Sequence, residues 1–110
     1  MIVSNHGGRQ LDQAVAPLRV LPEMAEQARG LTLMVDSGFR RGTDVLKALA
    51  LGAQCVFVGR PFLYAAAHAG EDGVRHAISL LAKEIDKDMA LLGRRDINEI
   101  GRDMIAEARP

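Results

Sequence analysis

The chain has few of the residues that mark a disulfide-stabilised, secreted protein. Its 110 residues include one cysteine, one tyrosine and no tryptophan. A single cysteine cannot form an internal disulfide framework, so the expected compartment is cytoplasmic. Cys55 lies within an apolar run, and this setting predicts a buried, unreactive thiol.

The chain also lacks an excess of charge of either sign and a long apolar segment. Fourteen Lys and Arg residues balance fourteen Asp and Glu residues, which argues against nucleic acid or an anionic membrane as a partner. Charges interrupt the 48% hydrophobic content throughout, so no segment is expected to span a bilayer, and no signal-peptide pattern opens the chain. A chain of this length forms at most one small domain with a modest core.

Patterns of strand and helix alternate along the chain. Strands are expected at residues 1–3, 31–35 and 55–58. Helices are expected at residues 17–28, 43–51, 62–68 and 72–92, followed by a short last helix that Asp96 caps. Thr43 is the expected cap of the second helix, and Gly52 its end. The continuous apolar run at residues 31–35 is typical of parallel strands covered on both faces.

This alternation predicts an α/β fold with a parallel sheet. Each polar motif directly follows a strand, which is where (β/α)₈ barrels place their active sites. A complete barrel needs roughly 250 residues and eight strands, whereas this chain supplies about three strands, whose outer edges would be unpaired. We therefore expect part of a barrel. Met1 falls inside a strand pattern, which favours a truncated reading frame or a partial product.

The most informative segment is SNHGGRQ at residues 4–10. His6 and Arg9 lie three residues apart with two glycines between them. An imidazole can exchange a proton near neutral pH, and a guanidinium offers a planar fork that suits a carboxylate. A proton acceptor beside a carboxylate-binding group is what removal of the hydroxyl proton of a 2-hydroxy acid requires. The alternative is a glycine-rich turn that carries a solvated His and Arg.

Two further motifs follow the second and third strand patterns: DSGFRRGTD at residues 36–44 and VFVGRP at residues 56–61. Taken in this order and spacing with residues 4–10, they resemble the FMN-dependent 2-hydroxy acid dehydrogenases and oxidases, a family that includes glycolate oxidase, lactate oxidase and mandelate dehydrogenase. The resemblance extends from Ile2 to about Glu99. The segment HGGRQ is highly specific to that family, whereas other phosphate-binding barrels share the two later motifs.

The resemblance implies a fold and a domain organisation. Residues 1–110 would be the C-terminal portion of a (β/α)₈ TIM barrel domain, with about strands six to eight and the helices that follow them. The family takes other active-site groups from its N-terminal half, including substrate-binding tyrosines, a lysine near the flavin and an aspartate that supports the histidine. The isolated chain is therefore expected to show little or no turnover.

The resemblance also implies roles for seven residues. His6 matches the general base of the family, and Arg9 matches the residue that binds the substrate carboxylate. The segments after strands seven and eight would bind the FMN phosphate and ribityl chain through Asp36, Gly38, Arg40, Gly59 and Arg60. Arg41 is expected to point elsewhere and to be solvated. No metal site is expected, because His68 and His76 lack partners at ligand spacing.

The implied reaction oxidises a 2-hydroxy acid to a 2-oxo acid and passes electrons from reduced FMN to a quinone, a cytochrome or oxygen. A homo-oligomer or a separately encoded N-terminal half are further expected partners, and the full-length enzyme could be peripheral to the inner membrane face. One alternative is a non-catalytic remnant that binds at most a phosphate-bearing ligand. Another is an FMN-dependent isomerase or nucleotide-handling barrel, against which the spacing of His6 and Arg9 argues.

Overall fold

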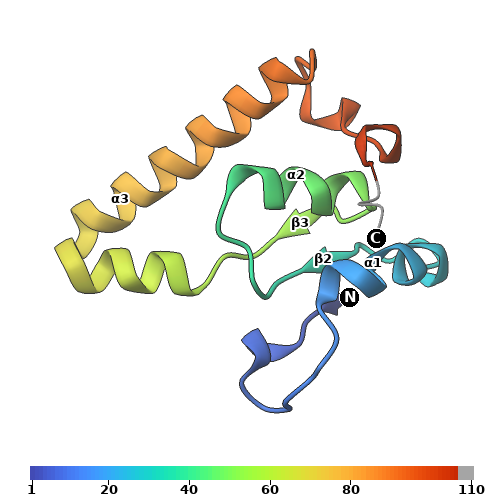
Figure 1. Ribbon diagram of the computed structural model, residues 1–110, viewed down its shortest axis with the longest axis horizontal. Helices are drawn as coiled ribbons and strands as arrows, with labels where there is room; N and C mark the ends of the chain where they lie inside the picture. Colours follow the sequence, from blue (N-terminus) through green and yellow to red (C-terminus); the bar gives the residue numbers. More distant parts are fainter. Residues whose placement is uncertain (107–110) are drawn as a thin grey trace.

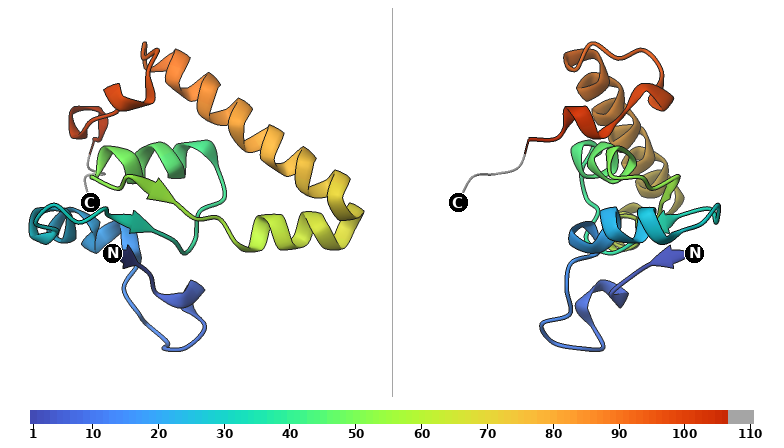
Figure 2. Two further views of the ribbon diagram at one scale, coloured as in Figure 1. Left: turned by 180° about the vertical axis from the view of Figure 1, so that it is seen from behind. Right: turned by 90° about the vertical axis from the view of Figure 1, so that its right-hand side faces the viewer.

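The computed structural model describes residues 1–106, which form a small parallel sheet with helices packed on one of its faces (Figures 1 and 2). The strands are β1 (Ile2–Val3), β2 (Met34–Val35) and β3 (Cys55–Val56), in the order β1-β2-β3. Both pairs are parallel, and the register places Val3 beside Val35 and Val35 beside Val56. The prediction of a parallel α/β arrangement is confirmed. The strands are shorter than their apolar runs, because only two residues of each are paired in the ladder.

The helices fall where the sequence predicts them, with one difference. They are α1 (Pro17–Gln27), α2 (Gly42–Ala50) and α3 (Arg60–Leu91). The two separate helices expected after β3 are joined in α3, but the backbone breaks sharply at Ala69 and Gly70, where φ is −146° and 55°. Short 3₁₀ turns are η1 (His6–Gly8), η2 (Ile97–Glu99) and η3 (Arg102–Met104). Asp96 caps η2 by accepting a hydrogen bond from the Asn98 N–H, so the expected last helix is a single turn.

The core lies between the sheet and the helices α1 and α2. Its buried side chains come from α1, the segment before and within β2, the turn after it, and the α2 region: Leu21, Leu33, Val35, Phe39, Ala48 and Ala53. The apolar face of α1 contributes Leu18, Met24 and Ala25 around Leu21, as its helical spacing predicts. Burial of this apolar surface is what holds the helices against the sheet.

The opposite face of the sheet is uncovered. Successive side chains of a strand point to opposite faces, so Val35 points into the core while Met34 points away from it. On the uncovered side, Ile2 is 52% exposed and Phe57 is 46% exposed, and Cys55 is exposed as well. The prediction that both faces are covered is wrong for this chain, and so is the prediction of a buried thiol, because α1 and α2 pack on the same face.

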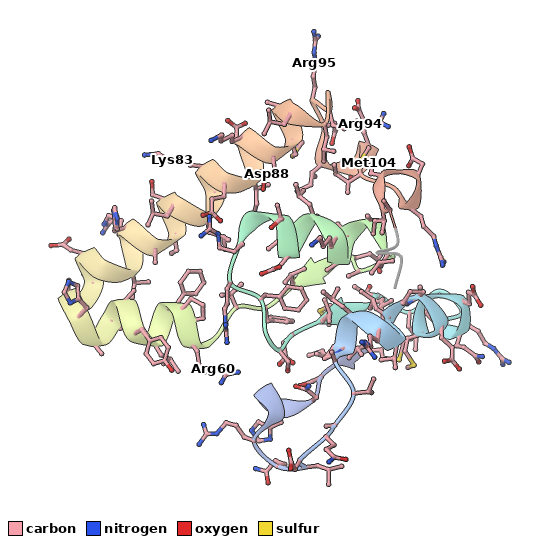
Figure 3. All side chains as sticks on the ribbon, in the orientation of Figure 1. Arg60, Lys83, Asp88, Arg94, Arg95 and Met104 are labelled. Atoms are coloured by element: carbon pink, nitrogen blue, oxygen red, sulfur yellow. The ribbon has the colours of Figure 1, made fainter. Side chains whose placement is uncertain are left out.

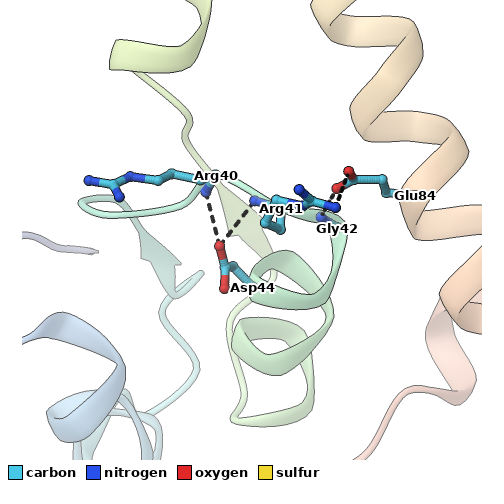
Figure 4. Close-up of polar contacts among 5 residues, drawn as sticks. All are labelled: Arg40, Arg41, Gly42, Asp44 and Glu84. Atoms are coloured by element: carbon cyan, nitrogen blue, oxygen red, sulfur yellow. Dashed lines mark hydrogen bonds and ion pairs between the residues drawn. The ribbon is translucent and has the colours of Figure 1, made fainter.

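The start of α2 is capped differently from the prediction. Arg41, not Thr43, is the N-cap residue, and the Asp44 carboxylate accepts hydrogen bonds from the N–H groups of Arg40 and Arg41, each at 3.0 Å (Figure 4). A carboxylate at this position satisfies N–H groups that have no partner within the helix. At the other end, Gly52 follows the last turn with a φ of 106°, as expected of a helix-ending glycine.

The second part of α3 returns along α2 and is fixed to its first turn (Figures 1 and 4). Glu84 accepts a hydrogen bond from the Gly42 N–H at 2.9 Å and pairs with the Arg41 guanidinium at 2.9 Å. The helices approach so closely that a Cβ on Gly42 would lie 2.7 Å from the Ile85 nitrogen. Within residues 1–106, none of these helices is long and apolar enough to cross a membrane.

Candidate functional site

Three loops meet at the carboxyl edge of the sheet, one after each strand. Parallel strands end at the same edge, so the segments that follow β1, β2 and β3 converge there. They line an open depression of about 240 Å³. All seven residues singled out in the sequence line it: His6, Arg9, Asp36, Gly38, Arg40, Gly59 and Arg60. The imidazole of His6 and the guanidinium of Arg9, both from the first motif, therefore lie at one surface.

The loop after β1 is held in an unusual backbone conformation. His6, Gly7 and Gly8 have φ values of 57°, 66° and 72°, in the left-handed region that favours glycine. The Asn5 side chain accepts a hydrogen bond from the Gly8 N–H at 3.1 Å and closes the turn. The His6 side chain is exposed in this turn, so the imidazole is accessible to a ligand.

The turn after β2 separates two adjacent arginines. Arg40 lines the depression, whereas Arg41 is directed toward α3 and pairs with Glu84 (Figure 4). Arg41 pairs with Glu84 away from the depression and is 71% exposed, so the prediction that it points elsewhere and is solvated is confirmed. The sequence did not predict the ion pair. Gly38 has a φ of 87° and open space where a Cβ would lie. Asp44 fixes the backbone of the turn and thereby the position of Arg40.

The turn after β3 brings a third guanidinium to the same surface, after those of Arg9 and Arg40. Arg60 lies at the start of α3 and reaches the loop after β1, where its Nη2 donates to the Gly7 carbonyl at 3.2 Å (Figure 3). Gly59 has an ordinary φ of −104°, and no atom lies within 4 Å of where its Cβ would be. Packing does not require glycine there, so the missing side chain leaves space open to the depression.

The structure adds to the site one residue, Ser37, that the sequence motifs did not single out. Ser37 Oγ accepts a hydrogen bond from the Gly7 N–H at 3.0 Å and donates one to Asp36 Oδ1 at 2.7 Å. These contacts link the turn after β2 to the loop after β1 across 30 residues of sequence. Only its place between Asp36 and Gly38 in a site motif could have drawn attention to Ser37.

The chemistry that this arrangement supports is anion binding beside a proton acceptor. Arg9, Arg40 and Arg60 bring three guanidinium groups to the depression, with Asp36 as the one carboxylate among its lining residues. Guanidinium groups bind carboxylate and phosphate oxygens in bidentate geometry. No cluster of three or more His, Cys, Asp or Glu side chains suited to a metal ion occurs within residues 1–106.

Comparison with known proteins agrees with the motifs. The family model described as FMN-dependent dehydrogenase matches residues 1–107. An L-lactate oxidase of Nostoc sp. is 52% identical over 101 residues, which cover 91% of this chain and 28% of that protein. A relative named peroxisomal (S)-2-hydroxyacid oxidase GLO3, from Arabidopsis thaliana, is 51% identical over 106 residues, covering 96% of this chain and 29% of the relative.

A solved structure shows the same spatial arrangement. The flavin-binding domain of baker's yeast flavocytochrome b2 superimposes with a TM-score of 0.89 at 50% sequence identity, over 94% of this chain and 28% of that one. The chain thus spans less than a third of the length of the relatives it matches. Because the family model covers nearly every residue, the chain belongs to the FMN-dependent dehydrogenase family, whose cofactor is FMN.

Proposed function

We propose that the chain provides the general base, the carboxylate-binding group and the FMN phosphate site for oxidation of a 2-hydroxy acid to a 2-oxo acid. The observation that carries this proposal is the convergence of all seven motif residues on one depression. The names of the relatives, an L-lactate oxidase and a (S)-2-hydroxyacid oxidase, support this class of substrate. The electron acceptor is a quinone, a cytochrome or oxygen.

The residues of the two later turns fit the phosphate end of FMN. Arg40 and Arg60 supply positive charge, while Gly38 and Gly59 leave open space above the backbone. At the start of α3, the N–H groups of Phe62 and Leu63 both donate to the Gly59 carbonyl. An anion would therefore meet the N–H groups of Gly59 and Arg60, together with the Arg60 side chain, at the positive end of the helix. Asp36 is assigned to the ribityl hydroxyls, from which a carboxylate can accept hydrogen bonds.

The residues of the first loop fit the substrate. Arg9 binds the carboxylate and so fixes the orientation of the 2-carbon, and His6 takes the proton of the 2-hydroxyl group. FMN, when bound, supplies the isoalloxazine ring that accepts the two electrons released from the 2-carbon. His6 is exposed at the rim of the depression, which leaves room for a small carboxylic acid.

We further propose that residues 1–110 form the C-terminal portion of a (β/α)₈ barrel domain, with β1, β2 and β3 as strands six to eight. Two observations support this placement: the match to 28% of the yeast flavin-binding domain, and the uncovered face and unpaired edges of the sheet. In a closed barrel, that face would point to the interior. The cytoplasmic compartment stays a prediction, since one relative is named a peroxisomal enzyme.

A chimera tests the proposed function. Residues 1–107 would replace the matching segment of the Nostoc L-lactate oxidase, and turnover with L-lactate would be measured with oxygen as acceptor. We expect an active, flavin-containing chimera whose kcat falls about 10²- to 10⁴-fold in His6→Gln. Arg9→Met is expected to raise KM steeply while FMN stays bound. His68→Gln, on the exposed surface of α3, is the matched control. An active chimera that is indifferent to His6→Gln would contradict the proposal.

A second candidate function is a separately encoded half-enzyme or a non-catalytic remnant. The uncovered apolar face of the sheet, with Ile2, Cys55 and Phe57 exposed, favours it, because a second polypeptide could pack there. The isolated chain would then bind a phosphate-bearing ligand without turnover. Mixing the chain with the N-terminal portion of the Nostoc lactate oxidase distinguishes a half-enzyme from a remnant. Recovered turnover indicates a half-enzyme, and no turnover indicates a remnant.

A further inference from the structure

The hydroxyl group of Ser37 is the centre of a hydrogen-bond network between two loops of the site. It donates its proton to Asp36 Oδ1 at 2.7 Å and accepts from the N–H groups of Gly7 at 3.0 Å and Asn5 at 3.4 Å. A hydroxyl has one proton and two lone pairs, so these three bonds use its full capacity, and the Ser4 hydroxyl lies farther away, at 3.5 Å. The bond to Asp36 is short because its acceptor is a carboxylate.

Ser37 occupies a backbone conformation that suits glycine better than serine. Its φ is 78°, and Gly38 follows with a φ of 87°. A glycine would adopt this conformation without the steric cost that a Cβ brings. What serine adds at this position is the hydroxyl group and its contacts with the loop after β1. Strained residues of this kind are concentrated at functional sites.

Both backbone polar groups of Gly7 form hydrogen bonds, and each bond joins Gly7 to a different turn. Its N–H donates to Ser37 after β2, and its carbonyl accepts from Arg60 after β3. Gly7 directly follows His6, whose own backbone has a φ of 57°. The peptide next to the imidazole is therefore fixed by the two turns to which the proposed function assigns the phosphate.

We infer that Ser37 is a positioning residue that couples anion binding at the two later turns to the placement of the His6 imidazole. Asp36 orients the hydroxyl, the hydroxyl holds the Gly7 N–H, and the Gly7 peptide sets the direction of the residue before it. The inference rests on the proposed function for the identity of the anion, but the link between Ser37 and Gly7 does not depend on it.

The link is tested without any ligand, by amide hydrogen exchange measured with NMR on the full chain. We expect the Gly7 amide to exchange about tenfold faster in Ser37→Ala and Ser37→Gly than in the wild type. Ser37→Gly keeps the backbone conformation available if the alanine variant folds poorly. Ser79→Ala, on α3 and away from the site, is the control and should leave Gly7 unchanged. Unchanged exchange in folded Ser37→Gly would overturn the inference.

The coupling is tested by titration with inorganic phosphate. In the wild type, we expect the Gly59 amide and the His6 ring signals to shift together with one apparent Kd. In Ser37→Gly, phosphate should still shift Gly59 while the His6 response becomes smaller, because only the bond from Arg60 to the Gly7 carbonyl still joins the two loops. An equal His6 response in both proteins would overturn the coupling. If phosphate shifts no signal in either protein, the proposed anion site fails, and the exchange of Gly7 alone then decides the role of Ser37.

Discussion

The two faces of the sheet differ in what covers them. On one face, Val3, Val35 and Val56 pack with the helices α1 and α2, and Val35 has no exposed surface. On the other face, Ile2 and Cys55 are exposed to solvent. The covered face supplies the hydrophobic stabilisation of this chain, whereas the uncovered face is apolar surface that water still contacts. The candidate site lies at the edge where both faces end.

The largest effect is expected from a substitution on the covered face. Leu21→Ala removes a fully buried side chain and leaves a cavity, so we expect a loss of about 2–5 kcal/mol in the free energy of unfolding. The matched control on the other face is Ile2→Ala, because Ile2 is half exposed and its truncation creates no enclosed cavity. Urea denaturation followed by circular dichroism gives both values. Equal losses at the two positions would show that the uncovered face is in fact buried in solution.

A smaller effect is expected one layer farther from the sheet, where α2 meets α3. Gly42→Ala places a methyl group within 3 Å of the backbone at Glu84 and Ile85, and the two helices must separate to accept it. We expect a loss of about 1–3 kcal/mol, measured in the same way. Gly59→Ala is the control, because open space surrounds that position. Full stability of Gly42→Ala would mean that α3 is not docked on α2.

The ion pair between the same helices is expected to contribute less. Glu84→Gln removes the attraction to Arg41 but keeps an oxygen that can accept the Gly42 N–H. Since the Arg41 side chain is largely exposed, we expect a loss of about 0.2–1 kcal/mol that shrinks further in high salt. A loss as large as that of Gly42→Ala, and insensitive to salt, would contradict a surface ion pair.

The smallest effect on stability, and a direct probe of the uncovered face, is expected at Cys55. Its thiol is exposed, so a soluble disulfide reagent should modify it in the folded chain as fast as in a short unstructured peptide. The modification should leave the unfolding midpoint nearly unchanged. Protection of Cys55 in the native chain, relieved by urea, would show that another molecule or a second copy covers this face.

Local patterns in the sequence predict much of this fold. Apolar periodicity placed α1, α2 and all three strands, and the rule that barrel chemistry follows strands placed His6, Arg40 and Arg60 at one edge. The sequence also predicts that α2 ends at Gly52, because a glycine in the left-handed conformation commonly follows a helix. These features depend on neighbours that are close in sequence or on the order of the strands.

The features that the sequence did not predict depend on contacts between distant residues. The bond from Gly7 to Ser37 joins positions 30 apart, and the bond from Gly42 to Glu84 joins positions 42 apart. The local periodicity of the sequence carries no information about such distant pairs. The apolar run predicts a buried Cys55, which is wrong, because such a run shows which side chains are apolar but not whether anything packs against the second face of the sheet.

The most direct test of the central claim, that the three loops form one site for FMN and its substrate, compares FMN, inorganic phosphate and riboflavin as ligands of this chain. Titration calorimetry would give the affinities, and NMR would follow the amides of Gly7, Gly38 and Gly59. We expect weak binding of FMN and phosphate with the three amides responding together, and no binding of riboflavin, which lacks the phosphate. Binding of riboflavin as tight as that of FMN, or phosphate binding that leaves these three amides unmoved, would contradict the claim.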